Sequence, residues 1–255
     1  MSSDAPVLAV EGLHKTFHIG FLRKRVQAVR GIDFAVRRGE FFGLLGPNGA
    51  GKTTTIKMML RLIFPTQGRI RLFDREAHDV DAMRRVGYMP ENPYVYQYLK
   101  PLEFLDLCGR LMGMSRRDRQ QRSEEMVSTV GLAGAVDRPI GKFSKGMMQR
   151  IGLAQALLHD PELLILDEPM SGLDPIGRKE IRDLLLEQHA RGKTLLFTSH
   201  ILTDVEKLCD RVAIMDHGKI AAEGTLSELL GAGGDQVETL EDLFVRQTVR
   251  NSGDR

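Results

Sequence analysis

The 255-residue sequence has no tryptophan, only two cysteines and no long hydrophobic run. Because Cys108 and Cys209 stand far apart, we expect neither a disulfide framework nor a thiolate metal site, as suits a reducing cytosol. No stretch approaches the roughly 20 apolar residues that span a bilayer, and the N-terminal Met1–Asp4 predicts no signal peptide. The formal net charge of +2 gives no reason to expect a nucleic-acid partner.

One glycine-rich segment stands out against this ordinary composition. Gly46–Thr53 has the spacing G-x-x-x-x-G-K-[ST] of the phosphate-binding loop known as Walker A. The preceding Phe41–Leu45 is short and apolar, as a buried strand is, and apolar residues recur at helical spacing from Ile56 to Ile63. A loop between a strand end and a helix start collects backbone N–H groups around an anion.

The residue types in this loop favour a nucleoside triphosphate with Mg²⁺. Glycines let the backbone curve around phosphate without an intervening Cβ. Lys52 can reach the β- and γ-phosphates, and the Thr53 hydroxyl can ligate Mg²⁺. The residues predicted to contact the nucleotide are Gly46, Pro47, Asn48, Gly49, Ala50, Gly51, Lys52, Thr53 and Thr54.

Candidate catalytic side chains follow two further predicted strands. Asp167 and Glu168 come directly after the apolar Leu163–Leu166, which is the Walker B arrangement. Asp167 can hold Mg²⁺, and Glu168 can orient or deprotonate an attacking water. His200 ends the strand that begins at Thr194, and parallel strands gather their carboxyl ends at one sheet edge, so we expect His200 near the same phosphates. On these residues alone, a solvated acidic turn and a surface histidine remain alternatives.

The type of predicted element changes along the chain. Val7–Glu11 and Leu13–Phe17 look like short strands, whereas residues 92–150 predict helices and no strand. This helical block is interpreted as an insertion into an α/β core. The expected division is residues 1–91 for the first part of the core, 92–150 for the helical subdomain, 151–230 for the second part of the core and 231–255 for a C-terminal tail.

In the content and order of its motifs, the sequence resembles the nucleotide-binding subunits of ATP-binding-cassette (ABC) transporters. Phe143–Met147 occupies the place of the family's signature motif, Ser171–Asp174 resembles the D-loop and Gly87–Glu91 resembles the Q-loop. His200 matches the switch histidine and Phe17 the aromatic residue that stacks on adenine. The resemblance covers nearly the whole chain. It implies a P-loop NTPase core with a parallel sheet, an N-terminal antiparallel β subdomain and an inserted α-helical subdomain.

The resemblance also implies an ATPase that uses ATP and Mg²⁺. In the family, the signature motif faces the ATP held by a second subunit, so that two ATP molecules are sandwiched in a head-to-tail dimer. The motifs and the resemblance together assign catalysis to Lys52, Glu168 and His200, ATP binding to Phe17, the loop residues, Ser144 and Gly146, and Mg²⁺ binding to Thr53, Asp167 and Glu91.

Three departures from the family pattern are visible. Glu91 stands where the Q-loop usually has glutamine, and the signature differs from the usual Leu-Ser-Gly-Gly-Gln at Phe143, Lys145 and Met147. Phe17 replaces a more frequent tyrosine, which keeps stacking and loses a hydroxyl. A carboxylate at position 91 could ligate Mg²⁺ more strongly, or repel the γ-phosphate when metal is absent.

The implied function is to drive a separate integral membrane permease from the cytoplasmic face of the plasma membrane. The partner in the dimer would be a second copy or a homologous cassette, and no nucleic acid is expected. Gly87–Leu99 and the short C-terminal tail look more like exporter cassettes than importer cassettes. One alternative is a cassette acting on DNA or the ribosome, although such relatives carry long coiled coils or two cassettes. The other is a P-loop phosphotransferase, which leaves the signature motif unexplained.

All four tyrosines lie between Tyr88 and Tyr98, and three of them recur at every second position from Tyr94. Tyrosine is enriched at protein interfaces. We therefore expect this stretch to contact the membrane partner. The alternative is that the rings pack on the predicted helix containing Leu102 and Leu105.

Overall fold

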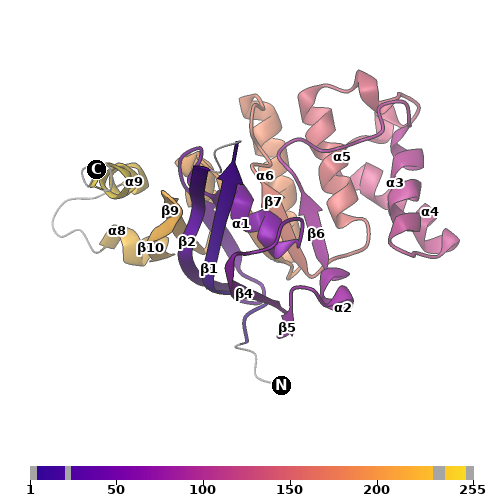
Figure 1. Cartoon of the computed structure of the whole chain (residues 1–255). Helices are drawn as coiled ribbons and strands as arrows, with labels where there is room; N and C mark the ends of the chain where they lie inside the picture. The colour runs from indigo at the N-terminus through magenta and orange to yellow at the C-terminus, as the bar shows by residue number, and fades with distance from the viewer. Residues whose placement is uncertain (1–4, 21–23, 232–238, 251–255) are drawn as a thin grey trace. The chain divides into compact units, whose positions relative to one another are not determined.

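The computed structural model describes residues 5–20, 24–231 and 239–250 of the chain (Figure 1). The chain forms two compact units. Unit 1 combines the described residues of Met1–Met83 and Thr194–Arg255, and unit 2 comprises Arg84–Lys193. Part of the expected C-terminal tail, residues 232–238 and 251–255, lies outside the described residues. The domain boundaries predicted from the sequence, at residues 91, 150 and 230, stay predictions.

Unit 1 contains an antiparallel sheet with the strand order β2-β1-β4-β5. Its strands are β1 (Leu8–Ile19), β2 (Lys24–Val36), β4 (Gln67–Leu72) and β5 (Arg75–Glu76). The antiparallel N-terminal sheet predicted from the sequence is confirmed. The prediction of two separate short strands is wrong, because β1 runs through Gly12, where a φ of +51° and a shift of register accommodate a bulge.

The second sheet of unit 1 is built on strand β3 (Phe41–Leu45), every residue of which is buried. β3 pairs in parallel with β8 (Thr194–Ser199) on one side and with β9 (Arg211–Asp216) on the other. β10 (Lys219–Thr225) pairs with β9 as an antiparallel hairpin. Continuous apolar strands such as β3 are typical of parallel sheets covered on both faces, and the predicted α/β class is confirmed.

Helices complete unit 1. In the described part of the chain, the two with eight or more residues are α1 (Lys52–Met59), which starts directly after the glycine-rich loop, and α9 (Leu240–Arg250). In α9, Leu240 and Leu243 are buried at helical spacing. The helices are α1 (Lys52–Met59), α2 (Val80–Met83), α7 (Leu202–Leu208), α8 (Leu226–Gly231) and α9 (Leu240–Arg250).

Unit 2 combines a pair of parallel strands with helices. Met89 of β6 (Val86–Met89) lies opposite Leu166 of β7 (Leu163–Asp167). Between these strands, residues 92–150 form helices and turns and no strand, as the sequence predicts. The helices of unit 2 are α3 (Pro101–Leu111), α4 (Arg116–Thr129), α5 (Lys145–Leu157) and α6 (Pro175–Ala190), with short 3₁₀ turns at Ala133–Ala135 and Ile140–Lys142.

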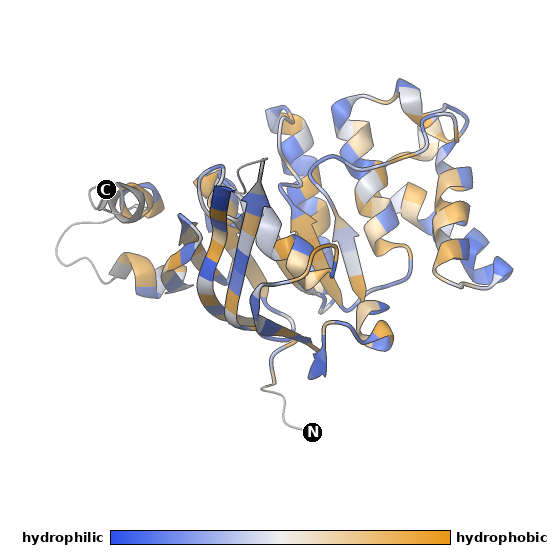
Figure 2. Cartoon of the chain, in the orientation of Figure 1, coloured by the Kyte–Doolittle hydropathy of each residue, from blue (hydrophilic) through white to orange (hydrophobic). Residues whose placement is uncertain are grey.

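Local sequence signals begin these helices. Pro101 is the first residue of α3, where its missing N–H costs no hydrogen bond. Ser115 caps α4 by accepting a hydrogen bond from the Asp118 N–H over 3.2 Å. Figure 2 shows hydrophobic and hydrophilic residues in alternating bands along α3. In α3 the apolar band buries Phe104 and Leu105, which is the pattern of an amphipathic helix.

Candidate functional site

The phosphate loop of unit 1 contains two glycines, Gly46 and Gly51, at which any side chain would collide with the backbone of a neighbouring strand. Gly46 has a φ of +155°, and a Cβ there would stand 2.2 Å from the main-chain oxygen of Met215 in β9. Gly51 has a φ of +110°, and a Cβ there would stand 2.5 Å from the main-chain oxygen of Ala28 in β2. The loop therefore lies directly against the backbone of two strands. This packing holds the loop and the N-terminus of α1 in place, and a helix N-terminus of this kind can bind an anion.

Lys52 lies inside this loop. Its side chain is 6% exposed, and its ammonium donates hydrogen bonds to the main-chain oxygens of Gly46 over 2.5 Å and Pro47 over 3.3 Å. The first turn of α1 contains no acidic residue. The buried ammonium and the helix dipole therefore give the loop a positive potential, which favours a polyanion such as a triphosphate.

His200 leaves the sheet beside this loop. In the parallel pairing of β3 with β8, Leu45 lies opposite Ser199. Gly46 and His200 are the next residues of their strands, and neighbouring strands lie about 4.8 Å apart. The His200 side chain is exposed. The main-chain N–H of Ile201 donates to Ser199 Oγ over 2.9 Å and turns the chain after the strand.

Three other predicted nucleotide contacts, Thr53, Thr54 and Phe17, also lie in unit 1. Thr53 is exposed in the first turn of α1, whereas Thr54 is half-buried. Phe17 is half-buried in β1, opposite Val26 of β2. The Lys15 ammonium lies 4.9 Å from the centre of the Phe17 ring, which is a cation–π distance. The role of Phe17 in stacking on adenine stays a prediction.

In unit 2, the two acidic residues predicted as Walker B end the buried strand β7. Asp167 is 2% exposed and Glu168 is 9% exposed. Glu168 has a φ of +49°, in the left-handed region that non-glycine residues rarely adopt. The main-chain oxygen of Glu168 accepts a hydrogen bond from the Ser171 N–H over 3.0 Å. Backbone strain of this kind is concentrated at functional sites, which supports a chemical role for Glu168.

The segment that carries Glu91 leaves the same edge of the β6–β7 pair. Met89 lies opposite Leu166, so Pro90 and Asp167 are the next residues of the two strands. The Glu91 side chain is exposed. Burial, and then the negative charge of Asp167, raises the pKa of Tyr88 to about 12, so its hydroxyl stays protonated at neutral pH.

The signature segment forms the N-terminus of α5. Ser144 is the N-cap residue, and its hydroxyl accepts a hydrogen bond from the Met147 N–H over 3.3 Å. Residues of the signature and of the D-loop line a cavity of about 470 Å³. Gly172 of the D-loop has a φ of +67° and packs on the Lys145 side chain. Asp174 then caps α6 by accepting from the Gly177 N–H over 2.7 Å.

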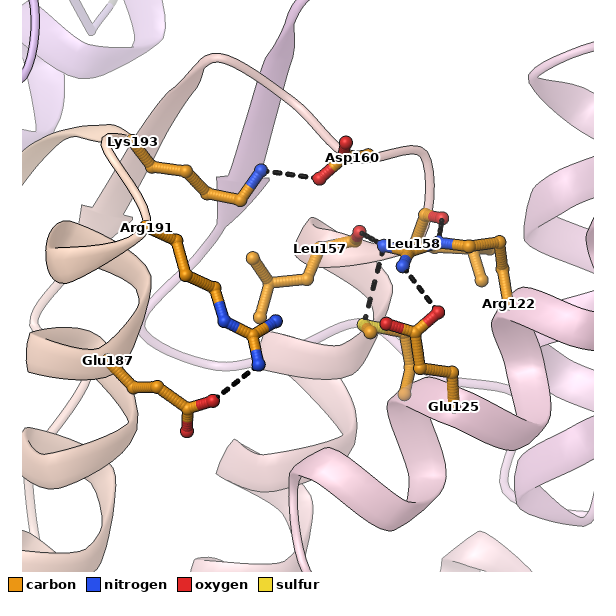
Figure 3. Close-up of polar contacts among 9 residues, drawn as sticks. Arg122, Glu125, Leu157, Leu158, Asp160, Glu187, Arg191 and Lys193 are labelled. Carbon is orange, nitrogen blue, oxygen red and sulfur yellow. Dashed lines mark hydrogen bonds and ion pairs between the residues drawn. The ribbon is translucent and has the colours of Figure 1, made fainter.

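Two arginines hold α5 in place. Figure 3 shows the Arg122 guanidinium of α4 at the C-terminus of α5, where it donates to the main-chain oxygens of Leu158 over 3.0 Å and Leu157 over 2.9 Å. In the other direction, Arg150 of α5 donates over 2.7 Å to the main-chain oxygen of Val130, the residue that ends α4. The sequence predicted no role for either arginine, because each bonds a backbone group of a distant helix.

Each unit carries an oxygen donor of the kind that Mg²⁺ requires. Unit 1 offers the Thr53 hydroxyl and unit 2 the Asp167 carboxylate, and both are hard oxygen ligands of the type that bind Mg²⁺ together with phosphate oxygens and water. Within the described part of the chain, no three His, Cys, Asp or Glu side chains gather as a metal cluster. Of the helices in the described ranges, none has both the length and the apolarity needed to cross a membrane.

Comparison with known proteins shows which family the chain resembles in sequence. Residues 29–171 match the family model described as ABC transporter. An uncharacterised ABC transporter ATP-binding protein of Nostoc is 47% identical over 229 residues, which cover 89% of this chain and 68% of that protein. The fluoroquinolones export ATP-binding protein of Mycobacterium tuberculosis is 40% identical over 225 residues, covering 88% of this chain and 72% of that protein.

Solved structures of ABC transporter cassettes have the same fold as this chain. An ATP-binding subunit of an ABC transporter superposes with a TM-score of 0.82 at 32% identity, covering 94% of this chain and 99% of that one. An ATP-binding cassette, dimeric in a post-hydrolysis state with ADP and Pi, superposes with a TM-score of 0.78 at 23% identity, covering 86% of this chain and 98% of that one. The predicted P-loop NTPase core is confirmed by these folds. The chain belongs to the ABC transporter family, and it is an ATP-binding cassette ATPase.

Proposed function

We propose that this protein is the ATP-hydrolysing subunit of an exporter and that it drives a separate integral membrane permease. The observation that carries the proposal is the phosphate loop, in which glycines lie against strand backbones and Lys52 is buried among loop carbonyls. Export is supported by the relative of Mycobacterium tuberculosis whose name specifies fluoroquinolone export.

Each site residue has a proposed role in hydrolysis. Lys52 neutralises charge on the β- and γ-phosphates, and His200 contacts the γ-phosphate from the neighbouring strand end. Glu168 takes a proton from the attacking water as general base. Thr53, Asp167 and Glu91 would hold Mg²⁺, which neutralises phosphate charge when bound. The strained backbone at Glu168 supports its assignment as the base.

The proposed active form is a dimer around two ATP molecules, formed with a second copy or a homologous cassette. Ser144 and Gly146 of one subunit would contact the ATP on the phosphate loop of the other. The N-terminus of α5 is suited to this role because it is an anion-binding end with an exposed serine. The related cassette solved as a dimer with ADP and Pi supports the arrangement by its fold.

The proposed docking surface for the permease is the tyrosine patch, defined as Tyr94, Tyr96 and Tyr98. These side chains are 89%, 51% and 75% exposed, and the rings of Tyr96 and Tyr98 lie 6.0 Å apart. The alternative from the sequence, in which they pack into the local core, is wrong, because the core position Leu105 is buried while all three rings are exposed. Exposed aromatic clusters are typical of interfaces.

A permease partner would hold the protein at the cytoplasmic face of the plasma membrane. The near-neutral net charge of +2 gives no electrostatic support to a nucleic-acid partner. We therefore propose the membrane partner in preference to a cassette that acts on DNA or the ribosome, and ATP hydrolysis in preference to phosphotransfer to an organic acceptor.

Mixing two inactive variants tests the proposal. Lys52→Ala destroys the phosphate loop of its own subunit, and Ser144→Arg destroys the signature that faces the partner's ATP. Each variant alone should be inactive, whereas an equal mixture should regain about a quarter of the wild-type rate, because half the dimers carry one intact site. Wild-type activity per molecule should also rise with protein concentration. A mixture that stays inactive at every ratio, or a Ser144→Arg protein that hydrolyses normally, would refute the dimer mechanism.

A further inference from the structure

The segment that carries Glu91 is tied to helix α5 by a hydrogen bond from a buried side chain. Gln149 lies in the second turn of α5, and its side-chain Nε2 donates to the main-chain oxygen of Glu91 over 2.9 Å. The Gln149 side chain is 1% exposed. The donor is therefore shielded from water, and the amide fixes the backbone of residue 91 to the helix that begins at the signature serine.

A second contact, one turn further along α5, ties the same segment to the same helix face. Gly152 is three residues after Gln149, so the two positions lie on one side of the helix. A Cβ at position 152 would stand 2.6 Å from Cγ and 3.0 Å from Cβ of Pro93. Glycine inside a helix is unfavourable relative to alanine. Here the Pro93 ring occupies the space that the methyl group of an alanine would need.

The side-chain oxygen of Gln149 indicates why glutamine occupies this position. Gln149 Oε1 is buried and has no hydrogen-bond partner in the part of the chain that the structure describes. An unpaired buried acceptor is destabilising. A methionine would fill nearly the same volume without that penalty. An amide at this position is therefore explained by its donor, which pairs with Glu91.

We propose that Gln149 is a positioning residue for ATP hydrolysis, which makes the Glu91 segment and the signature helix move as one body. A displacement of Glu91 then reaches Ser144, five residues before Gln149, through one rigid turn of helix. A cavity of about 670 Å³ is lined by Gln149, Tyr94 and Tyr96, so part of the tyrosine patch lies next to the linked body. The inference rests on the proposed function, in which Glu91 and Ser144 serve nucleotide sites.

Two substitutions break the link in different ways. Gln149→Met keeps the volume and removes the donor, and Gly152→Ala forces the Pro93 ring away from the helix while raising helix propensity. For each variant we expect kcat to fall about fivefold to tenfold, the value of one hydrogen bond, with little change in the KM for ATP. Adding Pro93→Ala to Gly152→Ala makes room for the methyl group, and it should return kcat to that of Pro93→Ala alone.

Matched controls separate this role from simple damage to the helix. Gln155→Met makes the same substitution at a half-buried position of the same helix, and Gly134→Ala adds a methyl group where nothing lies within 4 Å. Both should keep the wild-type kcat. Amide hydrogen exchange with and without Mg-ATP gives a direct readout: residues 91–95 and 145–149 should change protection together in the wild type, and separately in Gln149→Met.

The outcomes are distinct. A wild-type protein that does not hydrolyse ATP refutes the proposed function. An active wild type, with unaltered kcat and joint exchange in both Gln149→Met and Gly152→Ala, refutes this inference alone. If Gln149→Met does not fold, the Gly152→Ala variant and its Pro93→Ala rescue decide the question.

Discussion

Replacing Arg122 by methionine should destabilise unit 2 through the C-terminus of α5. The Arg122 side chain is 22% exposed, and its guanidinium donates to two main-chain oxygens at the end of α5, as Figure 3 shows. Leu158, whose oxygen is one of these acceptors, is fully buried. Methionine keeps much of the apolar stem, so the change removes mainly the charged donors.

The size of the effect follows from what each acceptor loses. A hydrogen bond from a charged donor to the Leu158 oxygen contributes about 1.5–3 kcal/mol. The Leu157 oxygen also accepts a hydrogen bond from the Asp160 N–H over 3.0 Å and keeps that partner in the variant. Losing the bond from Arg122 to this oxygen therefore costs only about 0.5–1 kcal/mol. The pair with Glu125, three residues along α4, adds only about 0.3 kcal/mol. The free energy of unfolding should therefore fall by about 2–4 kcal/mol.

Urea unfolding of wild type and variant, followed by far-ultraviolet circular dichroism, measures this loss. The control is Arg191→Met, because Arg191 pairs only with Glu187 among the contacts in Figure 3, and the two side chains are 54% and 48% exposed. An exposed pair of this kind is worth about 0.5 kcal/mol or less. Equal midpoints for Arg122→Met and wild type, at equal slopes, would show that the guanidinium does not support the helix end.

Further predictions concern catalysis, pH dependence, thiol reactivity and docking. Glu168→Gln should bind ATP, accumulate as a dimer and turn over about 10²–10⁴-fold more slowly. Burial lowers the pKa of His159 below its ordinary value of 6.5, so the unfolded chain binds this proton more readily, and stability should fall as the pH drops below about 6.5; His159→Gln should flatten the stability curve there. Burial raises the pKa of Cys108 to about 11, so alkylation at pH 8 should be more than ~100-fold slower than in urea. Replacing Tyr96 and Tyr98 together by alanine should weaken retention on permease-containing membranes at least about tenfold.

Each of these predictions has a control and a contrary result. Glu206→Gln and His78→Gln alter exposed side chains and should behave as wild type. Leu111→Ala removes a side chain that is 80% exposed outside the tyrosine patch, and should not alter membrane retention. Near-normal turnover by the glutamate variant, an unchanged pH profile, fast alkylation of the folded protein or undiminished retention would each contradict the corresponding assignment.

Sequence patterns gave the core strands correctly because burial alone determines them. β3 and β7 are each five residues long and buried at every position, and short continuous apolar runs predict such strands. The pattern failed at β1, where Gly12 looked like the end of a strand. Its positive φ instead belongs to a bulge inside one strand, and pairing with a neighbour decides between these outcomes.

The candidate site was predictable to the extent that motifs define it. The loop glycines, the acidic residues after β7 and the histidine after β8 all follow from local spacing. The exposure of the tyrosine patch does not follow from local spacing, because exposure depends on whether another segment of the chain covers the rings. The Gln149–Glu91 hydrogen bond joins residues 58 apart, and no local pattern reports it. The one available signal was Gly152, since an isolated glycine inside a helix indicates close packing.

The contacts of α5 explain why this helix can transmit motion instead of absorbing it. At its C-terminus, Arg122 of α4 holds the last carbonyls, and Arg150 in turn holds the end of α4 at Val130. Arg150 also pairs with Glu180 of α6, the helix that follows the D-loop. Near its N-terminus, Gln149 holds the Glu91 segment. A helix held at several points cannot bend or unwind locally without losing these hydrogen bonds. Any force on Glu91 must therefore displace the first turn of α5 as a unit, and that turn carries the signature serine.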